Sequence, residues 1–498
     1  MKKGLLKRFL AIMLAFATVI GMNVSSVAAA QGEDHAATYK VVSTGSETAT
    51  VKVTGVAQGD VLKAYKVVDI TYDKTTNSVK YAWNSQIKTE AEKIYATVED
   101  YMKAGDAGAK KLYTALIANY SSLTAADTKT AGSTGTVEFN LPMGQYLIVG
   151  EGYNVYAPMT ATIEPTVNPD NSNEYVIYDV NIEAKATTPS VDKKVQDKDK
   201  NWVDSTSTKI NEEREYKITV QAPIYPEDAK DKLFRVNDSM ETGLKGAKDL
   251  KIVNENGDTL TSPADYSITY TDSEGNTVDA AEATKFTIEF NMDSDKVAGQ
   301  KLTITYTSVA TADLKPGTPA KNNVTLEWPK NLWNTDSGYN KEPDETKVYT
   351  YGIKVQKTKE DGTSKLAGAE FKLYADKDCT QELHFIELSS GNYVLGGTST
   401  DNLVCDADGH LTLTGLDEGT YYLKEVKAPT DYTLLSEPIE VKVTKVDNGT
   451  YYTYSVKNTK GLKLPKTGDT AMLTMYIAGA AVALLGIAML MNAKRKQR

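Results

Sequence analysis

Cysteine is scarce in this chain. Its 498 residues include only two, Cys379 and Cys405, whereas small secreted domains that depend on disulfides are rich in cysteine. The domains must therefore be held together by large cores or by other kinds of cross-link. Because the two cysteines lie close in sequence, one disulfide between them is expected in an oxidising compartment. The alternative is a pair of free or buried thiols.

Positive charge and histidine are also in short supply. The formal net charge is -10, and binding to nucleic-acid phosphates needs clustered Lys and Arg, so no nucleic-acid partner is expected. His35, His384 and His410 are scattered and fit no metal-binding or catalytic-triad spacing. Without a catalytic constellation, an exported enzyme is disfavoured, and we expect no cofactor and no metal site.

Tyrosine and β-branched residues are what the chain does contain in quantity. It has 30 Tyr against 8 Phe, and such residues suit the half-buried faces of pleated sheets. The composition therefore predicts a mainly β extracellular protein.

The N-terminal segment has the pattern of an export signal. Basic residues at positions 2, 3, 7 and 8 precede a largely apolar run, which ends at Ala28-Ala29-Ala30. This order predicts a signal peptide over residues 1–30, cleaved after Ala30. An uncleaved membrane anchor is the alternative.

The C-terminal segment combines three signals in a fixed order. A pentapeptide is followed by an apolar stretch at 471–491, long enough to span a bilayer, and by a basic tail at 492–498 that favours the cytoplasmic side. The alternative is a permanent single-span protein. The pentapeptide consists of Leu464, Pro465, Lys466, Thr467 and Gly468.

This arrangement resembles the sorting signal of Gram-positive surface proteins. The resemblance implies that a sortase cleaves between Thr467 and Gly468 and transfers the Thr467 carbonyl to an amine. It also implies a protein that is secreted, crosses the membrane only transiently, and ends attached to the peptidoglycan of the cell wall.

Three domains are predicted between these ends, at residues 31–188, 189–346 and 347–461. The first contains strands and a helical stretch near 89–120, whereas the other two consist almost wholly of alternating apolar and polar runs. Residues 331–346 are rich in turn-forming residues and are predicted to be a loop. The pattern predicts tandem immunoglobulin-like β-sandwiches, the first with some helix.

The third domain places three polar residues at core positions. Side chains alternate between the two faces of a strand, so Lys357, Glu425 and Asn458 share the faces of their apolar neighbours. An isolated buried lysine is costly and must be compensated. A salt-bridge network would do this. So would a Lys357–Asn458 amide bond catalysed by Glu425, which removes the charges and needs no cofactor.

The third domain also resembles a Cna-B domain. The segment 421–432, Tyr-Tyr-Leu-Lys-Glu-Val-Lys-Ala-Pro-Thr-Asp-Tyr, is similar to the E-box of pilins. The resemblance implies a Cna-type sandwich in which Lys357 and Asn458 form an intramolecular isopeptide bond and Glu425 catalyses it.

The second domain repeats this pattern with Lys193, Asp238 and Asn322. It resembles the isopeptide-forming middle domain of backbone fimbrial subunits, which implies a Lys193–Asn322 bond catalysed by Asp238. The neighbouring Lys194 and Asn323 are excluded because strand alternation turns them outward. No comparable set stands out in the first domain.

One further lysine is needed if copies of the chain are linked together. In backbone pilins a lysine near the junction of the first two domains receives the next subunit's threonine. The stretch Val180–Lys185 matches in position, which implies Lys185, although the usual Tyr-Pro pair is absent. Lys330, in Trp328-Pro329-Lys330, is the second choice.

The sequence therefore predicts a structural subunit of a sortase-assembled pilus. Its expected partners are sortase, identical subunits and peptidoglycan, while a host-surface ligand and the sortase class are left open. The alternative is a wall-anchored adhesin or accessory pilin that is not polymerised.

Overall fold

A computed structural model describes residues 23–24, 39–226, 229–399, 401–445 and 451–461. Almost all of the predicted signal peptide, and the whole of the predicted sorting motif, membrane span and basic tail, lie outside these residues. No helix in the described part of the chain is long and apolar enough to cross a membrane. The chain divides into two compact units, one of residues 1–207, 212–313 and 319–348, the other of 208–211, 314–318 and 349–498.

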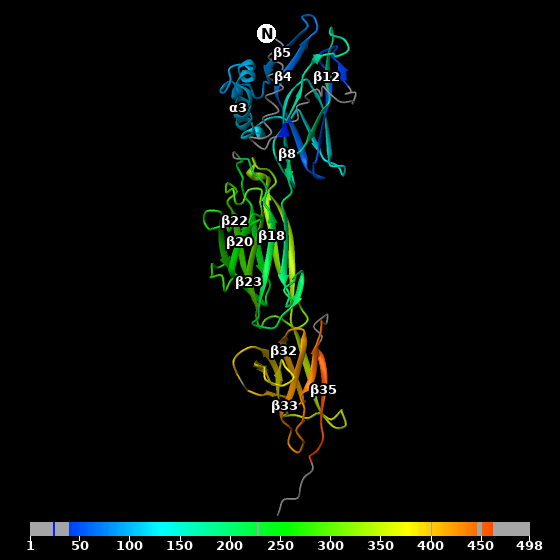
Figure 1. Ribbon diagram of the computed structural model, residues 1–498, viewed down its shortest axis with the longest axis vertical. Helices are drawn as coiled ribbons and strands as arrows, with labels where there is room; N and C mark the ends of the chain where they lie inside the picture. Colours follow the sequence, from blue (N-terminus) through cyan, green and yellow to red (C-terminus); the bar gives the residue numbers. More distant parts are fainter. Residues whose placement is uncertain (1–22, 25–38, 227–228, 400, 446–450, 462–498) are drawn as a thin grey trace, which may run out of the picture. The chain divides into compact units, whose positions relative to one another are not determined.

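The first predicted domain combines β-sheets with helix α3 (Val98–Ile117), which Figure 1 shows beside strands β4 and β5. Thr97 caps α3 by accepting a hydrogen bond from the Asp100 N–H, and Gly105 interrupts the helix at a positive φ of 68°. The remaining elements are β1 (Asn23–Val24), β2 (Tyr39–Val41), β3 (Thr48–Thr54), β4 (Val61–Asp73), β5 (Ser78–Trp83), α2 (Lys88–Glu92), η2 (Tyr120–Ser122), β6 (Asp127–Thr130), β7 (Thr136–Pro142), β8 (Gly144–Glu151), β9 (Val155–Tyr156), β10 (Met159–Ile163), β11 (Thr166–Val167), β12 (Tyr175–Tyr178), β13 (Val180–Glu183) and β14 (Ala186–Thr187).

Strand pairing in the first domain shows how its sequence builds a core. One sheet has the order β1-β10-β8-β4-β5, with β6 also paired to β4, and smaller sheets join β11-β12-β2, β13-β3-β7 and β14-β9. Along β3, every second residue is buried, as in Val51 and Val53, because one face of the strand packs inward. The short strand β1 lies within the predicted signal peptide, so cleavage after Ala30 would remove it.

The second predicted domain is a sandwich of two sheets. Their orders are β16-β15-β18-β23-β20 and β17-β25-β24-β19-β22-β21. Strict alternation of buried and partly exposed residues along β18 and β23 places one face of the first sheet in the core. The strands are β15 (Ser190–Gln196), β16 (Trp202–Val203), β17 (Ser205–Ser207), β18 (Glu213–Gln221), β19 (Arg235–Met240), β20 (Leu244–Asn254), β21 (Tyr266–Thr271), β22 (Lys285–Phe290), β23 (Lys301–Ala310), β24 (Ala320–Pro329) and β25 (Tyr339–Tyr349).

The prediction of a loop over residues 331–346 is wrong for its second half. Strand β25 pairs with β24 along its whole length, from Tyr339 opposite Pro329 to Val348 opposite Ala320. Its polar and proline-containing sequence has low strand propensity, but backbone pairing with a long buried neighbour overrides that preference. Only a short 3-10 turn, η3 (Thr335–Ser337), lies within the rest of the segment.

The third predicted domain also has two main sheets, with orders β29-β30-β32-β26-β35 and β28-β27-β33-β34, the strand β31 pairing with β27. In the first of these, β26 and β35 are parallel neighbours although they stand at opposite ends of the domain's sequence. The strands are β26 (Tyr351–Lys359), β27 (Glu370–Tyr374), β28 (Glu382–Leu383), β29 (Phe385–Ser389), β30 (Asn392–Leu395), β31 (Leu403–Val404), β32 (His410–Leu416), β33 (Gly419–Lys427), β34 (Ile439–Val443) and β35 (Tyr452–Asn458).

Apart from β1, which lies in the predicted signal peptide, and the last three residues of β25, each sheet of the described residues is built from strands of a single predicted domain. Two short segments of the second domain nevertheless group with the third: the Thr208 N–H donates to the Tyr349 carbonyl and the Ile210 N–H to the Gly415 carbonyl, at 2.8 and 3.0 Å. The mainly β, immunoglobulin-like fold class is confirmed, and the three-domain division stays a proposal.

Candidate sites for covalent cross-links

The third domain brings Lys357, Glu425 and Asn458 together in its core. Lys357 lies on β26 and Asn458 on its parallel neighbour β35, while Glu425 reaches them from β33 in the other sheet. The lysine side chain is 0% exposed and its Nζ lies 3.1 Å from Glu425 Oε1. Lys357 Nζ also contacts Asn458 Oδ1, and Asn458 Nδ2 lies 3.1 and 3.0 Å from the two Glu425 oxygens.

The backbone around this cluster fixes the positions of its members. The Gly409 carbonyl accepts a hydrogen bond from the Lys357 N–H at 2.7 Å. Gly409 has a φ of 73°, and a Cβ there would lie 2.7 Å from the Lys357 carbonyl oxygen, so the turn before β32 requires glycine. On the acidic side, Glu425 Oε2 accepts a hydrogen bond from the Leu435 N–H at 3.0 Å.

The electrostatics of this cluster favour a reactive amine. Burial lowers the pKa of Lys357 below its ordinary value, against the opposing effect of the Glu425 carboxyl. An amine that loses its proton more readily is a better nucleophile, and here it contacts the side-chain amide of Asn458. The Glu425 carboxyl touches both partners and can carry protons between them.

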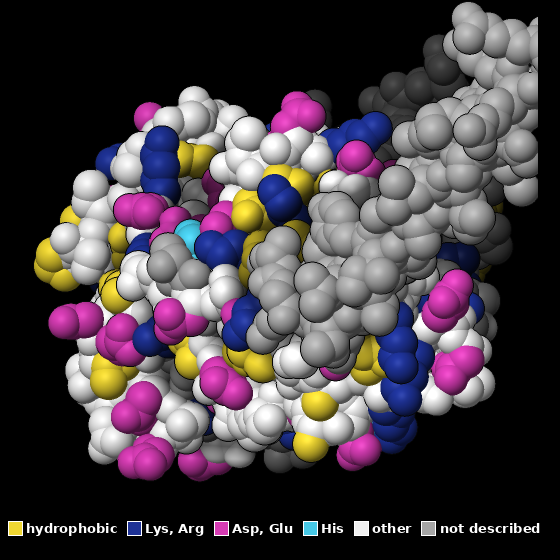
Figure 2. Space-filling view, turned by 90° about the horizontal axis from the view of Figure 1, so that it is seen from below, with side chains coloured by type: hydrophobic (Ala, Val, Ile, Leu, Met, Phe, Trp, Pro, Cys, Tyr) yellow, Lys and Arg dark blue, Asp and Glu magenta, His cyan; other side chains and the backbone are white. Residues whose placement is uncertain are grey.

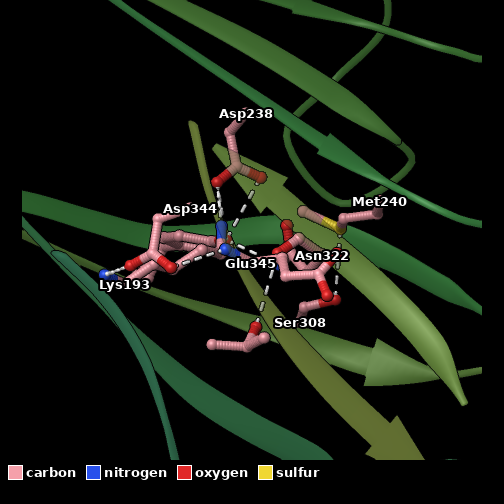
Figure 3. Close-up of polar contacts among 9 residues, drawn as sticks. Lys193, Asp238, Met240, Ser308, Asn322, Asp344 and Glu345 are labelled. Atoms are coloured by element: carbon pink, nitrogen blue, oxygen red, sulfur yellow. Dashed lines mark hydrogen bonds and ion pairs between the residues drawn. The ribbon is translucent and has the colours of Figure 1, made fainter. Parts of the chain in front are cut away.

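The second domain brings Lys193, Asp238 and Asn322 together, and Figure 3 shows the polar residues around them. Lys193 lies on β15 of one sheet, whereas Asp238 and Asn322 lie on the paired strands β19 and β24 of the other. Lys193 Nζ contacts Asp238 Oδ2, and neither side chain is exposed. The Lys193 N–H donates to Asp344 Oδ2 at 2.6 Å, which fixes β15 beside β25 at this point.

Burial also shifts both ionisable groups of this pair toward their neutral forms. It lowers the pKa of Lys193 and raises the pKa of Asp238, in each case against the attraction between the two groups. A neutral amine and a protonated carboxyl are the forms that amide formation needs at the start.

Sequence reasoning missed a fourth member of the second-domain cluster, Tyr306 on β23. Its hydroxyl lies 3.0 Å from Lys193 Nζ and 3.2 Å from each Asp238 oxygen, and it accepts a hydrogen bond from Asn322 Nδ2 at 2.8 Å. Tyr306 shares the buried face of its strand with Leu302 and Ile304. In the sequence it therefore looks like an ordinary core aromatic, and no local signal marks it.

The alternation argument separates the candidate residues from their neighbours. Lys194 points away from the core and its Nζ lies 2.9 Å from Asp192 and 2.6 Å from Asp204. Asn323 is partly exposed, whereas Asn322 is buried. These orientations agree with the exclusion of Lys194 and Asn323 from the cluster.

Both lysines proposed to link subunits have exposed positions. Lys185 lies between β13 and β14, and its carbonyl accepts a hydrogen bond from the Ala157 N–H at 3.0 Å. Lys330 follows β24; its N–H donates to the Gly338 carbonyl at 3.0 Å, and its carbonyl accepts from the Gly152 N–H at 3.1 Å. Exposure therefore does not choose between them.

The expected Cys379–Cys405 disulfide is not formed: both cysteines are free. Strand β27 lies between them in space. The Cys405 N–H donates a hydrogen bond to the carbonyl of Ala369, the residue before β27. The Cys379 N–H donates to the carbonyl of Asp376, which follows β27 in the chain. Seven residues of extended chain cover roughly 20 Å, far more than the Cα separation of about 4.4–6.8 Å that a disulfide allows.

The face drawn in Figure 2 has the character of a solvated surface. In Figure 2, acidic and basic side chains are interspersed, and hydrophobic side chains appear in separate spots. Among the described residues, no group of three or more His, Cys, Asp or Glu could hold a metal ion.

Two family models match the last third of the chain. A prealbumin-like fold domain of the SpaA type matches residues 351–460, and an LPXTG cell wall anchor motif matches residues 456–498. The chain is thus a cell-wall-anchored surface protein built from β-sandwich domains.

Curated relatives and solved structures narrow this class. The chain is similar to the trypsin-resistant surface T6 protein of Streptococcus pyogenes serotype M6, with 24% identity over 55% of this chain and 49% of that protein, so the match spans about half the relative's length. It is also 24% identical to the fimbrial subunit type 1 of Actinomyces viscosus, over 74% and 76% of the two chains.

Among solved structures, the chain is similar to the T6 backbone pilin of serotype M6 Streptococcus pyogenes, which is described as a modular three-domain structure. The TM-score is 0.56 and the sequence identity 21%, over 80% of both chains. Together with the anchor motif, these likenesses confirm the predicted resemblance to Gram-positive backbone pilins and the predicted wall-anchored location at the cell surface.

Proposed function

We propose that this chain is the structural subunit of a covalently polymerised pilus and is stiffened by two internal Lys–Asn amide bonds. The observation that carries the proposal is the fully buried Lys357, whose amine contacts both the Asn458 amide and the Glu425 carboxyl. A buried lysine so placed has a nucleophile's environment and a substrate within reach. The second cluster, around Lys193, also places a buried lysine against a carboxyl, and its asparagine is joined to both through the Tyr306 hydroxyl.

The two internal bonds would act on different parts of their sandwiches. In the third domain a Lys357–Asn458 bond joins neighbouring strands of one sheet, which are the first and last of the domain. In the second domain a Lys193–Asn322 bond joins strands of opposite sheets. The third-domain bond would carry tension directly between the first and last strands of its domain, and the second-domain bond between the first strand β15 and β24, the neighbour of the last strand β25.

Polymerisation would use the sorting motif as the donor. Sortase would cleave after Thr467 and pass the Thr467 carbonyl to a lysine of the next copy, while the last subunit is passed to peptidoglycan. Lys185 is the preferred acceptor because its place after β13, beside the first residues of the second domain, corresponds to the family's linking lysine. Lys330 is the second choice.

The test is a comparison of surface extracts from cells producing the wild-type chain, Lys185→Ala or Lys330→Ala. The proposal predicts a ladder of high-molecular-mass species that resists boiling in detergent, and predicts that Lys185→Ala removes it while Lys330→Ala leaves it. Loss of the ladder only in Lys330→Ala would make Lys330 the acceptor. A wild-type chain that reaches the wall without any ladder would contradict polymerisation and support the non-polymerised adhesin.

A further inference from the structure

The two buried clusters differ in how their carboxyl group meets the asparagine. In the third domain, Asn458 Nδ2 lies within 3.1 Å of both Glu425 oxygens. In the second domain no hydrogen bond joins Asp238 to Asn322 in the described part of the chain. Aspartate is one methylene shorter than glutamate, so the Asp238 carboxyl contacts Lys193 but does not reach Asn322.

A tyrosine hydroxyl occupies the gap that the shorter side chain leaves. Tyr306 Oη lies 3.2 Å from both Asp238 oxygens, and Asn322 Nδ2 donates to it at 2.8 Å. It is also 3.0 Å from Lys193 Nζ. Tyr306 is thus in hydrogen-bond contact with the nucleophile, the carboxyl and the leaving nitrogen at once.

The Tyr306 ring is held firmly in this position. It stacks on Tyr216, with ring centroids 5.3 Å apart and an interplanar angle of 11°, and meets the edge of Phe286 at 5.1 Å. Tyr216 and Phe286 are both buried in the core of the second domain. A fixed ring keeps the hydroxyl within reach of its three partners, which is what a proton-transfer group requires.

We propose that Tyr306 is a catalytic residue of the second domain, which relays a proton between Asp238 and the leaving nitrogen of Asn322. This inference rests on the proposed Lys193–Asn322 bond. In effect, Asp238 and Tyr306 together replace the single glutamate of the third domain.

The relay balances every atom and proton. The Lys193 amine attacks the Asn322 side-chain carbonyl carbon, a new N–C bond forms, and the C–Nδ2 bond breaks. Tyr306 gives its proton to Nδ2, which departs as ammonia, and takes a proton from the carboxyl of Asp238. Asp238 recovers a proton from the attacking nitrogen, so both groups end as they began and no oxidant or cofactor is consumed.

The test follows formation of the cross-link in the full-length chain after a short pulse of synthesis. Proteolytic peptides are analysed by mass spectrometry for the joined Lys193 and Asn322 peptides, with the joined Lys357 and Asn458 peptides as an internal control. Because general acid–base groups contribute about 10²–10⁴-fold to reaction rates, Tyr306→Phe should slow formation of the Lys193–Asn322 bond by roughly 10²-fold. The Lys357–Asn458 bond should form at the wild-type rate.

Tyr270→Phe is the matched control, because it removes a tyrosine hydroxyl from the same domain, where the Tyr270 ring packs on Phe286 with centroids 6.4 Å apart. Among the described residues, no hydrogen bond joins Tyr270 to Lys193, Asp238 or Asn322, whereas the Tyr216 hydroxyl interacts with Asn322 and would not be a neutral control. The variant should form the Lys193–Asn322 bond at the wild-type rate. Equal slowing in Tyr270→Phe and Tyr306→Phe would assign the effect to packing and overturn the relay.

Two other outcomes are also decisive and are distinguishable from each other. A Tyr306→Phe chain that forms the bond at the wild-type rate would overturn the relay while leaving the proposed function intact. A wild-type chain with no joined Lys193 and Asn322 peptides would overturn the second-domain bond itself, and the relay with it.

Discussion

At the residue scale, the two clusters show how burial turns ordinary polar side chains into reactive ones. Lys193 and Lys357 are among the largest fully buried side chains of the described chain. Leaving a charged amine in such a place is costly unless it is paired or neutralised. The proposed amide bond would neutralise the amine permanently, which would explain why a fold places a lysine there.

The same reasoning predicts a pH dependence once the bond is prevented. In Asn322→Ala the Lys193 amine persists, and burial lowers its pKa below 10.5. Between that lowered value and 10.5 the unfolded chain binds more protons than the folded one, so folding stability rises with pH. The wild-type amide does not titrate there. The stability gap between wild type and Asn322→Ala should therefore narrow from pH 7 to pH 10.

This narrowing should be at most about 1.4 kcal/mol per pH unit and is measured by denaturant unfolding across that range. The double variant Lys193→Met, Asn322→Ala lacks the amine and serves as the control, because its gap to wild type should not change with pH. A gap that stays constant or widens in Asn322→Ala would contradict the buried-amine account.

At the element scale, strand alternation is the property that places each site residue. It predicted from sequence that Lys193 faces inward and Lys194 outward, and the structure has these orientations. Alternation is a local property of the backbone, so it can be applied without knowledge of the fold. Tyr306 could not be found in this way, because its partners come from β15, β19 and β24, and only the packed sheets bring these strands together.

The alternation leads to a paired mutational prediction. Lys193→Ala should abolish the loss of one ammonia from the chain and lower the free energy of unfolding by about 4–5 kcal/mol, if the entropy estimate for disulfides applies to this loop. Lys194→Ala should change neither mass loss nor stability appreciably, since it removes only two surface ion pairs, with Asp192 and Asp204. Intact-mass measurement and denaturant unfolding check both. Equal effects of the two variants would refute the register assignment.

The sequence predictions that were wrong at this scale have the same physical origin, because they also depended on which strands meet in the folded chain. Residues 339–349 form β25 despite a polar sequence, because pairing with β24 satisfies their backbone groups. The two cysteines are near in sequence but separated by β27, a relationship that sequence distance cannot reveal. Local chemistry was therefore a sound guide to which faces are buried, and a poor guide to which segments meet.

At the scale of the whole molecule, the C-terminal anchor motif and the buried clusters fit a single proposed function. The wall-anchor motif lies at one end of the chain, and the two buried clusters are the proposed sites of covalent bonds inside the domains. The chain has only two cysteines, both free, so its proposed cross-links are amides, which reducing conditions do not cleave. The first domain adds no third set that sequence reasoning could identify.

The most direct test of this account is the intact mass of the wild-type chain spanning residues 31–461, which contains all three predicted domains. Each internal amide bond releases one ammonia, and the account predicts a mass below that of the sequence by two ammonia molecules. An unmodified mass would contradict it.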